Sequence, residues 1–214
     1  MTLSAQAKAK LEAGLKEAGI ELSDAIRQKL LDYLSLMHKW NKVHNLTAVR
    51  DPEDMVTLHL LDSLSVLPHI NAKRLLDVGS GAGLPGIPLA LCLPHLQVTV
   101  MDSSHKKASF LCQAKAELGI ANLEVVCGRV EQYHPDVLFD IVISRAFSDL
   151  AEFISLTRHL CAPGGVWMAM KGVYPYDELA QLKSAPAQIV PLQVPGLAAQ
   201  RHLVFLANEN LEAA

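Results

Sequence analysis

The sequence lacks an apolar run long enough to cross a bilayer. Half of its 214 residues are hydrophobic, yet no stretch approaches the roughly 20 consecutive apolar residues that a membrane-spanning helix needs. The first residues also lack the apolar segment of a secretory signal. We therefore expect a globular, cytoplasmic protein with no membrane partner, built around one hydrophobic core.

Patterns typical of metal and disulfide sites are also missing. The four cysteines form no C-x-x-C pair and have apolar neighbours, which favours buried, reduced thiols at Cys92, Cys112, Cys127 and Cys161. The nine histidines show no H-E-x-x-H or similar cluster, so we predict no metal site. The first 50 residues carry eight basic and five acidic side chains, whereas the remainder carries 11 and 17. This asymmetry indicates either an end that faces a polyanion or a solvated helical surface.

The first 72 residues show helical spacing and no strand-like alternation. One helix is expected within residues 4–18, and a second from Asp24 to about Asn41, with Ser23 as its N-cap. Asp51-Pro52 is typical of the start of a third helix, which we expect to reach Leu64. We predict that residues 1–72 form a helical extension packed on a core of residues 73–214.

From residue 73, short apolar runs alternate with helical stretches. Such alternation indicates a doubly wound α/β fold, a mostly parallel sheet with helices on both faces. A short connection joins the last two runs and favours an antiparallel pair. The strands are expected at residues 74–79, 97–102, 123–127, 139–144, 166–171, 188–194 and 202–207, and the helices at 87–93, 106–118 and 150–160.

The most specific motif is the glycine-rich segment after the first strand, residues 77–86. Glycines let the backbone turn sharply and approach a nucleotide, and the helix that follows supplies free N–H groups. Gly81, Gly83 and Gly86 satisfy G-x-G-x-x-G, so a dinucleotide oxidoreductase is one interpretation. However, the carboxylate of Asp77 suits a cationic ligand better than a pyrophosphate. We therefore favour S-adenosylmethionine, which has a sulfonium and no phosphate, with Asp77, Gly79 and Gly81 at its site.

Two further polar residues follow apolar strands. Asp102 ends the second strand, where its carboxylate could accept hydrogen bonds from both ribose hydroxyls. Arg145 follows the fourth strand and needs a partner, which could be a substrate phosphate, the methionine carboxylate of the cofactor or a structural acid. In the predicted cleft we expect no His–Asp or Cys–His pair that demands a catalytic role.

The order and spacing of several segments resemble the RsmG family, also called GidB. The resemblance spans nearly the whole chain and implies a class I S-adenosylmethionine-dependent methyltransferase, Rossmann-like, with a seven-stranded sheet. Leu84 stands where many relatives have phenylalanine. The matching segments are residues 40–47, 59–64, 77–88, 102–103, 128–131, 144–147, 170–172 and 201–203.

The resemblance also implies an activity, the methylation of N7 of a guanine in 16S ribosomal RNA, and a small-subunit partner. The alternatives are a methyltransferase that acts on another RNA, a protein or a small molecule, and an RNA-binding assembly factor with a vestigial cofactor site. Arg145 is the catalytic candidate, in a reaction accelerated mainly by positioning, and we expect a monomer. The implied cofactor contacts are Gly79, Leu84, Asp102, Val130, Glu131 and Arg145.

Contact with RNA phosphates requires cations at the surface. We expect these cations at Lys42, Arg50, Lys171 and Arg201. The resemblance gives no chemical role to residues 45–47 or to His59 and Asp62. Helix capping and packing are slightly favoured there over substrate contact.

Overall fold

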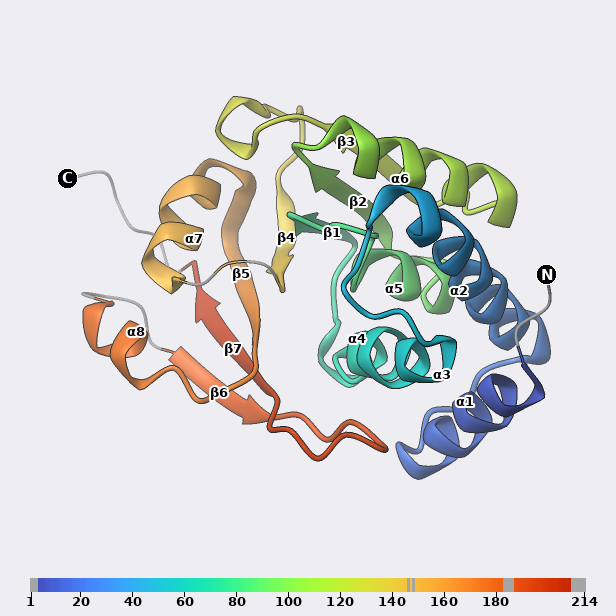
Figure 1. The fold of residues 1–214 in the computed structure, drawn as a ribbon. Coiled ribbons are helices and arrows are strands. Elements are labelled where there is room, and N and C mark those ends of the chain that lie inside the picture. Colours follow the sequence, from blue (N-terminus) through green and yellow to red (C-terminus); the bar gives the residue numbers. More distant parts are fainter. Residues whose placement is uncertain (1–3, 146, 148, 183–186, 209–214) are drawn as a thin grey trace.

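The computed structural model describes residues 4–145, 147, 149–182 and 187–208. A seven-stranded sheet in the order β3-β2-β1-β4-β5-β7-β6 forms its centre (Figure 1). Only β7 runs against the other strands, pairing antiparallel with both β5 and β6. The strands are β1 Arg74–Val78, β2 Gln97–Asp102, β3 Leu123–Cys127, β4 Phe139–Ser144, β5 Cys161–Lys171, β6 Ala187–Pro191 and β7 His202–Ala207.

Helices cover both faces of the sheet, as predicted (Figure 1). The N-terminal helices, α5 and α6 share one apolar cluster with one face, while α7 packs on the other face in a second cluster. The helices are α1 Ala5–Glu17, α2 Asp24–His44, α3 Pro52–Met55, α4 Asp62–Leu64, α5 Gly86–Cys92, α6 His105–Leu118, α7 Leu150–Thr157 and α8 Tyr176–Gln181. Short 3₁₀ turns occupy Leu67–His69, Val130–Gln132 and Arg158–Leu160.

The helix caps follow from local chemistry. The Ser23 hydroxyl accepts a hydrogen bond from the amide of Ile26 and begins α2. The Asp51 carboxylate accepts hydrogen bonds from the amides of Glu53 and Asp54 and begins α3, where Pro52 occupies the first turn. α2 continues to His44 and ends at Asn45, whose φ of 49° is left-handed, so this helix is three residues longer than expected.

The third predicted helix is not continuous. A π-helical segment, Val56–Leu61, separates α3 from α4. The spacing of the apolar residues did not reveal this wide turn, in which Val56, Leu60 and Leu61 join the apolar cluster while Leu58 is only partly buried. The carbonyl of Leu58 in this segment accepts a hydrogen bond from Arg145, so the turn is tied to the end of β4.

The helices before β1 pack directly on the sheet domain. Tyr33 of α2 is fully buried, its ring lies 6.3 Å from that of Phe110 in α6, and its hydroxyl donates to the carbonyl of Ala82. Trp40 makes an edge contact with Phe110 at 5.6 Å. These contacts bring α2 against the glycine-rich segment that follows β1.

Candidate functional site

The turn after β1 has a conformation that requires glycine. Gly79, Gly81 and Gly83 have φ values of 66°, 61° and 89°, a region that L-residues with a side chain rarely adopt. The amide of Gly83 donates to the carbonyl of Ser80 at 2.8 Å. The chain therefore reverses within a few residues and enters α5 at Gly86.

Asp77 lies behind this turn. Its side chain is fully buried, and Oδ2 accepts a hydrogen bond from the amide of Gly86 at 2.8 Å. A Cβ on Gly86 would lie 2.5 Å from Cγ1 of Val100 and 2.8 Å from Oδ2 of Asp77, so only glycine allows this approach. Oδ1 of Asp77 has no hydrogen-bond partner among the described residues. Burial raises the pKa of Asp77 to about 7.

Asp102 fastens the same turn from the end of β2. Its Oδ2 accepts hydrogen bonds from the amide of Gly81 at 2.9 Å and from Nζ of Lys107 at 3.3 Å. Its Oδ1 accepts one from the amide of Ser104 at 2.9 Å. The carboxylate is thereby held in one orientation between the turn and the start of α6.

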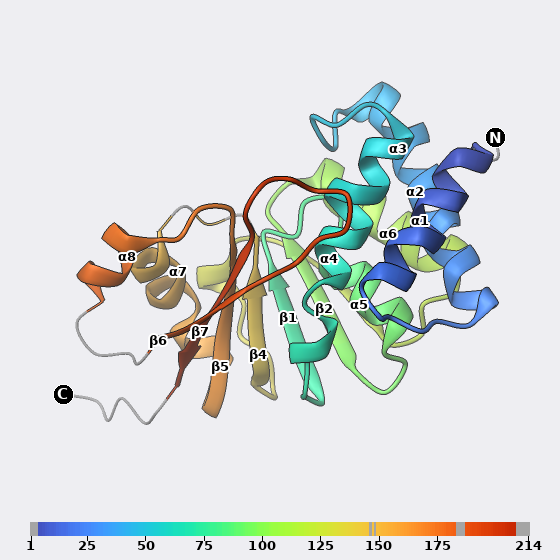
Figure 2. The same ribbon diagram turned by 90° about the horizontal axis from the view of Figure 1, so that it is seen from below.

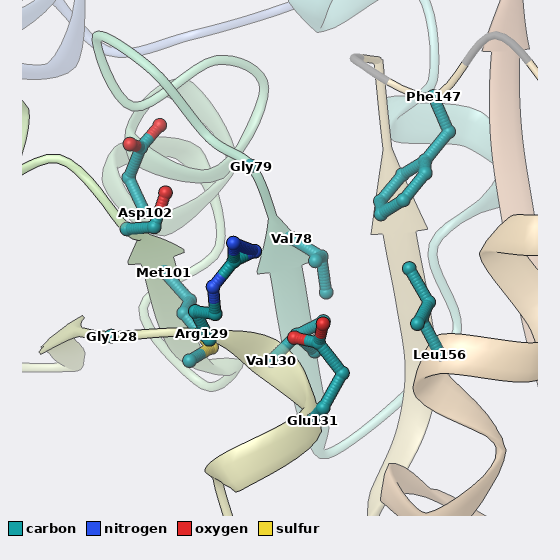
Figure 3. A pocket seen from close by; sticks show the side chains of 11 residues that line it. Val78, Gly79, Met101, Asp102, Gly128, Arg129, Val130, Glu131, Phe147 and Leu156 are labelled. Carbon is teal, nitrogen blue, oxygen red and sulfur yellow. The ribbon is translucent and has the colours of Figure 1, made fainter.

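A cavity of about 190 Å³ opens beside this turn, at the carboxyl ends of β1, β2 and β3. Arg129, Val130 and Glu131 lie along one side, and Phe147 and Leu156 project from the opposite side (Figure 3). Crevices at this edge of an open α/β sheet are the usual ligand sites of such folds. The lining residues are Val78, Gly79, Met101, Asp102, Ser103, Gly128, Arg129, Val130, Glu131, Phe147 and Leu156.

Half of the predicted cofactor residues line this cavity, namely Gly79, Asp102, Val130 and Glu131. The other four lie elsewhere: Asp77 and Gly81 shape the turn, Leu84 is buried in the apolar core, and Arg145 binds an acidic residue. Their direct contact with a cofactor stays a prediction. Seven lining residues were not among the predicted cofactor contacts. Four of them, Val78, Met101, Ser103 and Arg129, are adjacent in sequence to a predicted contact. Leu156 on α7 gave no such signal.

Arg145 has a structural acid as its partner. Its Nη1 donates to Oδ2 of Asp62 at 3.0 Å and to the carbonyl of Leu58 at 3.2 Å. The other oxygen of Asp62, Oδ1, accepts from Nε of Arg201 at 2.8 Å. Asp62 is buried, so one carboxylate joins α4, the end of β4 and the residue before β7. We call these three residues the arginine clamp.

A second network explains the unassigned N-terminal motif. The amide of Thr47 donates to Oδ1 of Asn41, and Oγ1 of Thr47 lies 2.9 Å from Nε2 of His59. Burial lowers the pKa of His59. Nδ1 of this ring has no hydrogen-bond partner within the described ranges. Thr47 and His59 thus contact each other within the N-terminal helices, and the preference for packing and helix-end capping over substrate contact stays a prediction.

The predicted RNA-facing cations differ in their surroundings. Lys42 is exposed on α2. The guanidinium of Arg50 donates to the carbonyl of Asn41 and to Oδ1 of Asn45, closing the end of that helix. Nζ of Lys171 donates to Glu178 at 2.6 Å and to the carbonyl of Phe147 at 3.1 Å. Lys171 and Arg201 therefore serve internal contacts, and RNA contact by any of these cations stays a prediction.

The cysteines depart from expectation. Cys161 is buried and Cys92 is half-buried, and burial raises the pKa of each thiol to about 12. Cys112 and Cys127 are exposed, so the prediction of burial was wrong for these two. Sγ of Cys127 lies 3.3 Å from Nδ1 of His105, next to the cavity-lining Gly128. These residues are 22 positions apart, which is why the sequence did not reveal a Cys–His pair.

Neither a metal cluster nor a membrane span is found in the described part of the chain. No three His, Cys, Asp or Glu side chains there come together as ligands would. The helices within the same ranges also lack the combination of length and apolar character that crossing a bilayer requires.

Comparison with known proteins identifies the family. A family model described as rRNA small subunit methyltransferase G matches residues 26–204. The chain belongs to this family. The protein named Ribosomal RNA small subunit methyltransferase G from Methylobacillus flagellatus is 66% identical over 197 residues, covering 92% of this chain and 96% of its own length. The protein of the same name from Laribacter hongkongensis is 53% identical over 201 residues, covering 93% and 97%.

Solved structures establish the fold of this family member. The O-methyltransferase TomG from Streptomyces achromogenes, determined in complex with SAM, matches with a TM-score of 0.59 and 17% identity, covering 96% of this chain and 99% of its own. A SAM-dependent methyltransferase from Aquifex aeolicus matches with a TM-score of 0.57 and 19% identity, covering 79% and 96%. The chain thus has the class I, Rossmann-like methyltransferase fold, as predicted.

Removal of the Asp62 carboxylate should weaken the fold. Asp62→Ala leaves two largely buried guanidinium groups without their shared partner, and we expect the free energy of unfolding to fall by about 3 kcal/mol. Denaturant unfolding measures this change. The control is Asp32→Ala at an exposed carboxylate bonded to Gln28, with an expected loss below about 0.5 kcal/mol. Equal losses in both variants would contradict a buried clamp.

The stability contributed by Asp77 should depend on pH. Its pKa is higher in the folded chain than in the unfolded chain, so the folded state holds the proton more tightly, and stability is lost as the pH rises toward 7. Relative to Asp77→Asn, which does not titrate, the free energy of unfolding should fall by roughly 1.4 kcal/mol per pH unit over much of this window. Denaturant unfolding of both proteins at pH 5, 6 and 7 measures the difference, and parallel pH profiles would refute the assignment.

Proposed function

We propose that this chain transfers the methyl group of S-adenosylmethionine to N7 of a guanine in the 16S RNA of the small ribosomal subunit. The observation that carries the proposal is family membership over residues 26–204, a range that includes the glycine turn, Asp102 and every residue of the cavity. The two relatives compared above are named for the same activity class, methylation of small-subunit ribosomal RNA.

The residues at the cavity suit this cofactor. Gly79 offers close approach of the backbone, and the carboxylates of Asp102 and Glu131 can accept hydrogen bonds from hydroxyl or amino groups. Val130, Phe147 and Leu156 provide apolar surfaces for a flat ring system. Because S-adenosylmethionine has no phosphate, two carboxylates beside it carry no electrostatic cost of the kind a dinucleotide would meet.

The chemistry requires little from the side chains. S-adenosylmethionine supplies an electrophilic methyl group on a positively charged sulfur. Guanine N7 has a free lone pair, so no proton must be removed before attack and no general base is needed. The protein contributes by holding the two reactants in line at short distance, which lowers the entropic part of the barrier. The arginine clamp fixes the end of β4 beside the cavity and serves this positioning.

Methyl transfer to isolated small subunits tests the proposal. Subunits from a bacterial strain that lacks its own copy of this enzyme are incubated with the protein and S-adenosylmethionine labelled in the methyl group. We expect label in 16S RNA and 7-methylguanine after nuclease digestion. Label in a protein or small-molecule fraction, or at another guanine atom, would replace the proposal with another substrate class. A cytoplasmic location and a monomeric state stay predictions.

Cofactor affinity should depend on Asp102. Asp102→Ala removes a charged acceptor, and we expect affinity for S-adenosylhomocysteine to fall about 10- to 150-fold, measured by calorimetry. Asp102→Asn keeps an oxygen that can accept from Gly81 and should lose less. The control is Asp136→Ala, an exposed carboxylate outside the cavity lining, which should bind as the wild type does. Unchanged affinity in Asp102→Ala would remove this residue from the cofactor site.

A further inference from the structure

An aromatic cluster lies at the edge of the sheet that also carries the cavity. β5 ends at Lys171, and the chain passes through Val173 and Tyr174 into α8, which begins at Tyr176. β7 begins opposite, because Lys171 pairs with His202. Figure 2 shows α8 and the start of β7 toward the same end of the strands, the upper end in this view. We call Val173, Tyr174, Tyr176 and His202 the aromatic pad.

The three rings of the aromatic pad are ordered by contact with one another. The centroids of Tyr174 and Tyr176 are 4.3 Å apart with an interplanar angle of 38°. The ring of His202 meets Tyr174 edge-on at 5.5 Å and 84°. Nδ1 of His202 lies 3.3 Å from the carbonyl of Gly172. Tyr174 is therefore held between two neighbours, which supports Tyr176 at the surface.

The outer part of the aromatic pad is open to solvent. Tyr176 is 73% exposed and Val173 is 77% exposed. Single exposed apolar residues are common on protein surfaces, but here Val173 adjoins three contacting rings, one of which is the exposed Tyr176. Such a surface offers flat apolar faces to a partner.

The charges around the aromatic pad favour bases over phosphates. Asp177 is exposed on α8, and Glu178 is paired with Lys171. Arg201, the cation before His202, is bonded through Nε to Asp62. Carboxylates repel a phosphate backbone but do not prevent contact with the faces of uncharged nucleobases.

The aromatic pad is linked to the cavity through Lys171, the last residue of β5. Nζ of Lys171 donates to the carbonyl of Phe147 at 3.1 Å, and the side chain of Phe147 lines the cavity. A guanine that receives the methyl group would lie beside the cofactor in the cavity, at the carboxyl ends of the parallel strands, and β5 brings the aromatic pad to the same end of the sheet. Enzymes that modify a base act on unstacked nucleotides, whose neighbours lose their stacking partners.

We infer that the aromatic pad stacks an unpaired nucleobase of the RNA substrate beside the target guanine, with Tyr176 as the principal contact. The inference rests on the proposed function. Stacking of this kind is tolerant of sequence, because every base has a π-face, and it replaces the stacking that the RNA loses when the target is exposed.

Binding of a short single-stranded RNA tests the inference. The probe is a fluorescein-labelled decamer of adenosine, and fluorescence anisotropy gives its affinity for the full chain. Tyr176→Ala should weaken binding about 5- to 100-fold, whereas Tyr176→Phe, which keeps the ring, should stay within about twofold. The salt dependence of binding should be the same in all three proteins, because no charge is changed.

The matched control is Val137→Ala, which removes an exposed apolar side chain just before β4. This residue lies at the amino end of the parallel strands, opposite to the end that carries the aromatic pad. It should bind the decamer as the wild type does. Equal weakening in Val137→Ala and Tyr176→Ala, equal weakening in Tyr176→Phe, or no binding by the wild type would each overturn the inference.

A second measurement separates this inference from the proposed function. Affinity for S-adenosylhomocysteine should be unchanged in Tyr176→Ala, which places the defect in RNA binding. If the wild type methylates 16S RNA at N7 but Tyr176→Ala binds the decamer normally, the stacking surface is wrong and the proposed function stands. If the decamer depends on Tyr176 but no RNA is methylated, the proposed function is wrong and the stacking surface stands.

Discussion

The site depends on how tightly the turn after β1 is fastened. Gly86 approaches Asp77 so closely that a methyl group would not fit, and the amide of Gly81 is bonded to Asp102 of the neighbouring strand. Two carboxylates from adjacent parallel strands thus hold one loop, one from behind and one from the side. This double attachment fixes Gly79 and Asp102 at the rim of the cavity. It also buries a carboxyl group, whose pKa rises as a result.

The arginine clamp joins elements on the other side of β1 in a similar way, through one buried carboxylate. Asp62 belongs to the N-terminal helices, yet it binds Arg145 after β4 and Arg201 before β7. Phe147, two residues beyond Arg145, forms the wall of the cavity opposite Val130 (Figure 3). The N-terminal helices therefore bind the residue that follows β4 without lining the cavity.

Local patterns predicted most of the fold, because strand alternation, helix caps and the glycine motif each depend on residues that are close together in the sequence. The mostly parallel sheet, the antiparallel final pair and the place of Asp102 follow from such patterns, whereas the order of the strands within the sheet was not predicted. The partners of Arg145 do not, since Asp62 lies 83 residues away and the same carboxylate reaches Arg201 across 139 residues. For the same reason the sequence revealed neither Leu156 in the cavity nor the pairing of Cys127 with His105. The π-helical turn was missed because one regular helix was expected from Pro52 to Leu64.

Most of the basic residues predicted to contact RNA form ion pairs or hydrogen bonds within the protein, which limits their contact with RNA phosphates. Arg145 and Arg201 share one buried carboxylate, Lys171 is bonded to Glu178, and Arg50 closes the end of α2. Arg145, Arg201 and Lys171 are paired with acids within the protein, so each has less to offer a phosphate than an exposed cation such as Lys42 or Arg50. A chain with a net charge of −3 gains little from long-range attraction to RNA. Recognition at the reacting base then depends more on shape and on the flat faces of bases, which the proposed aromatic surface at the carboxyl end of β5 would contact.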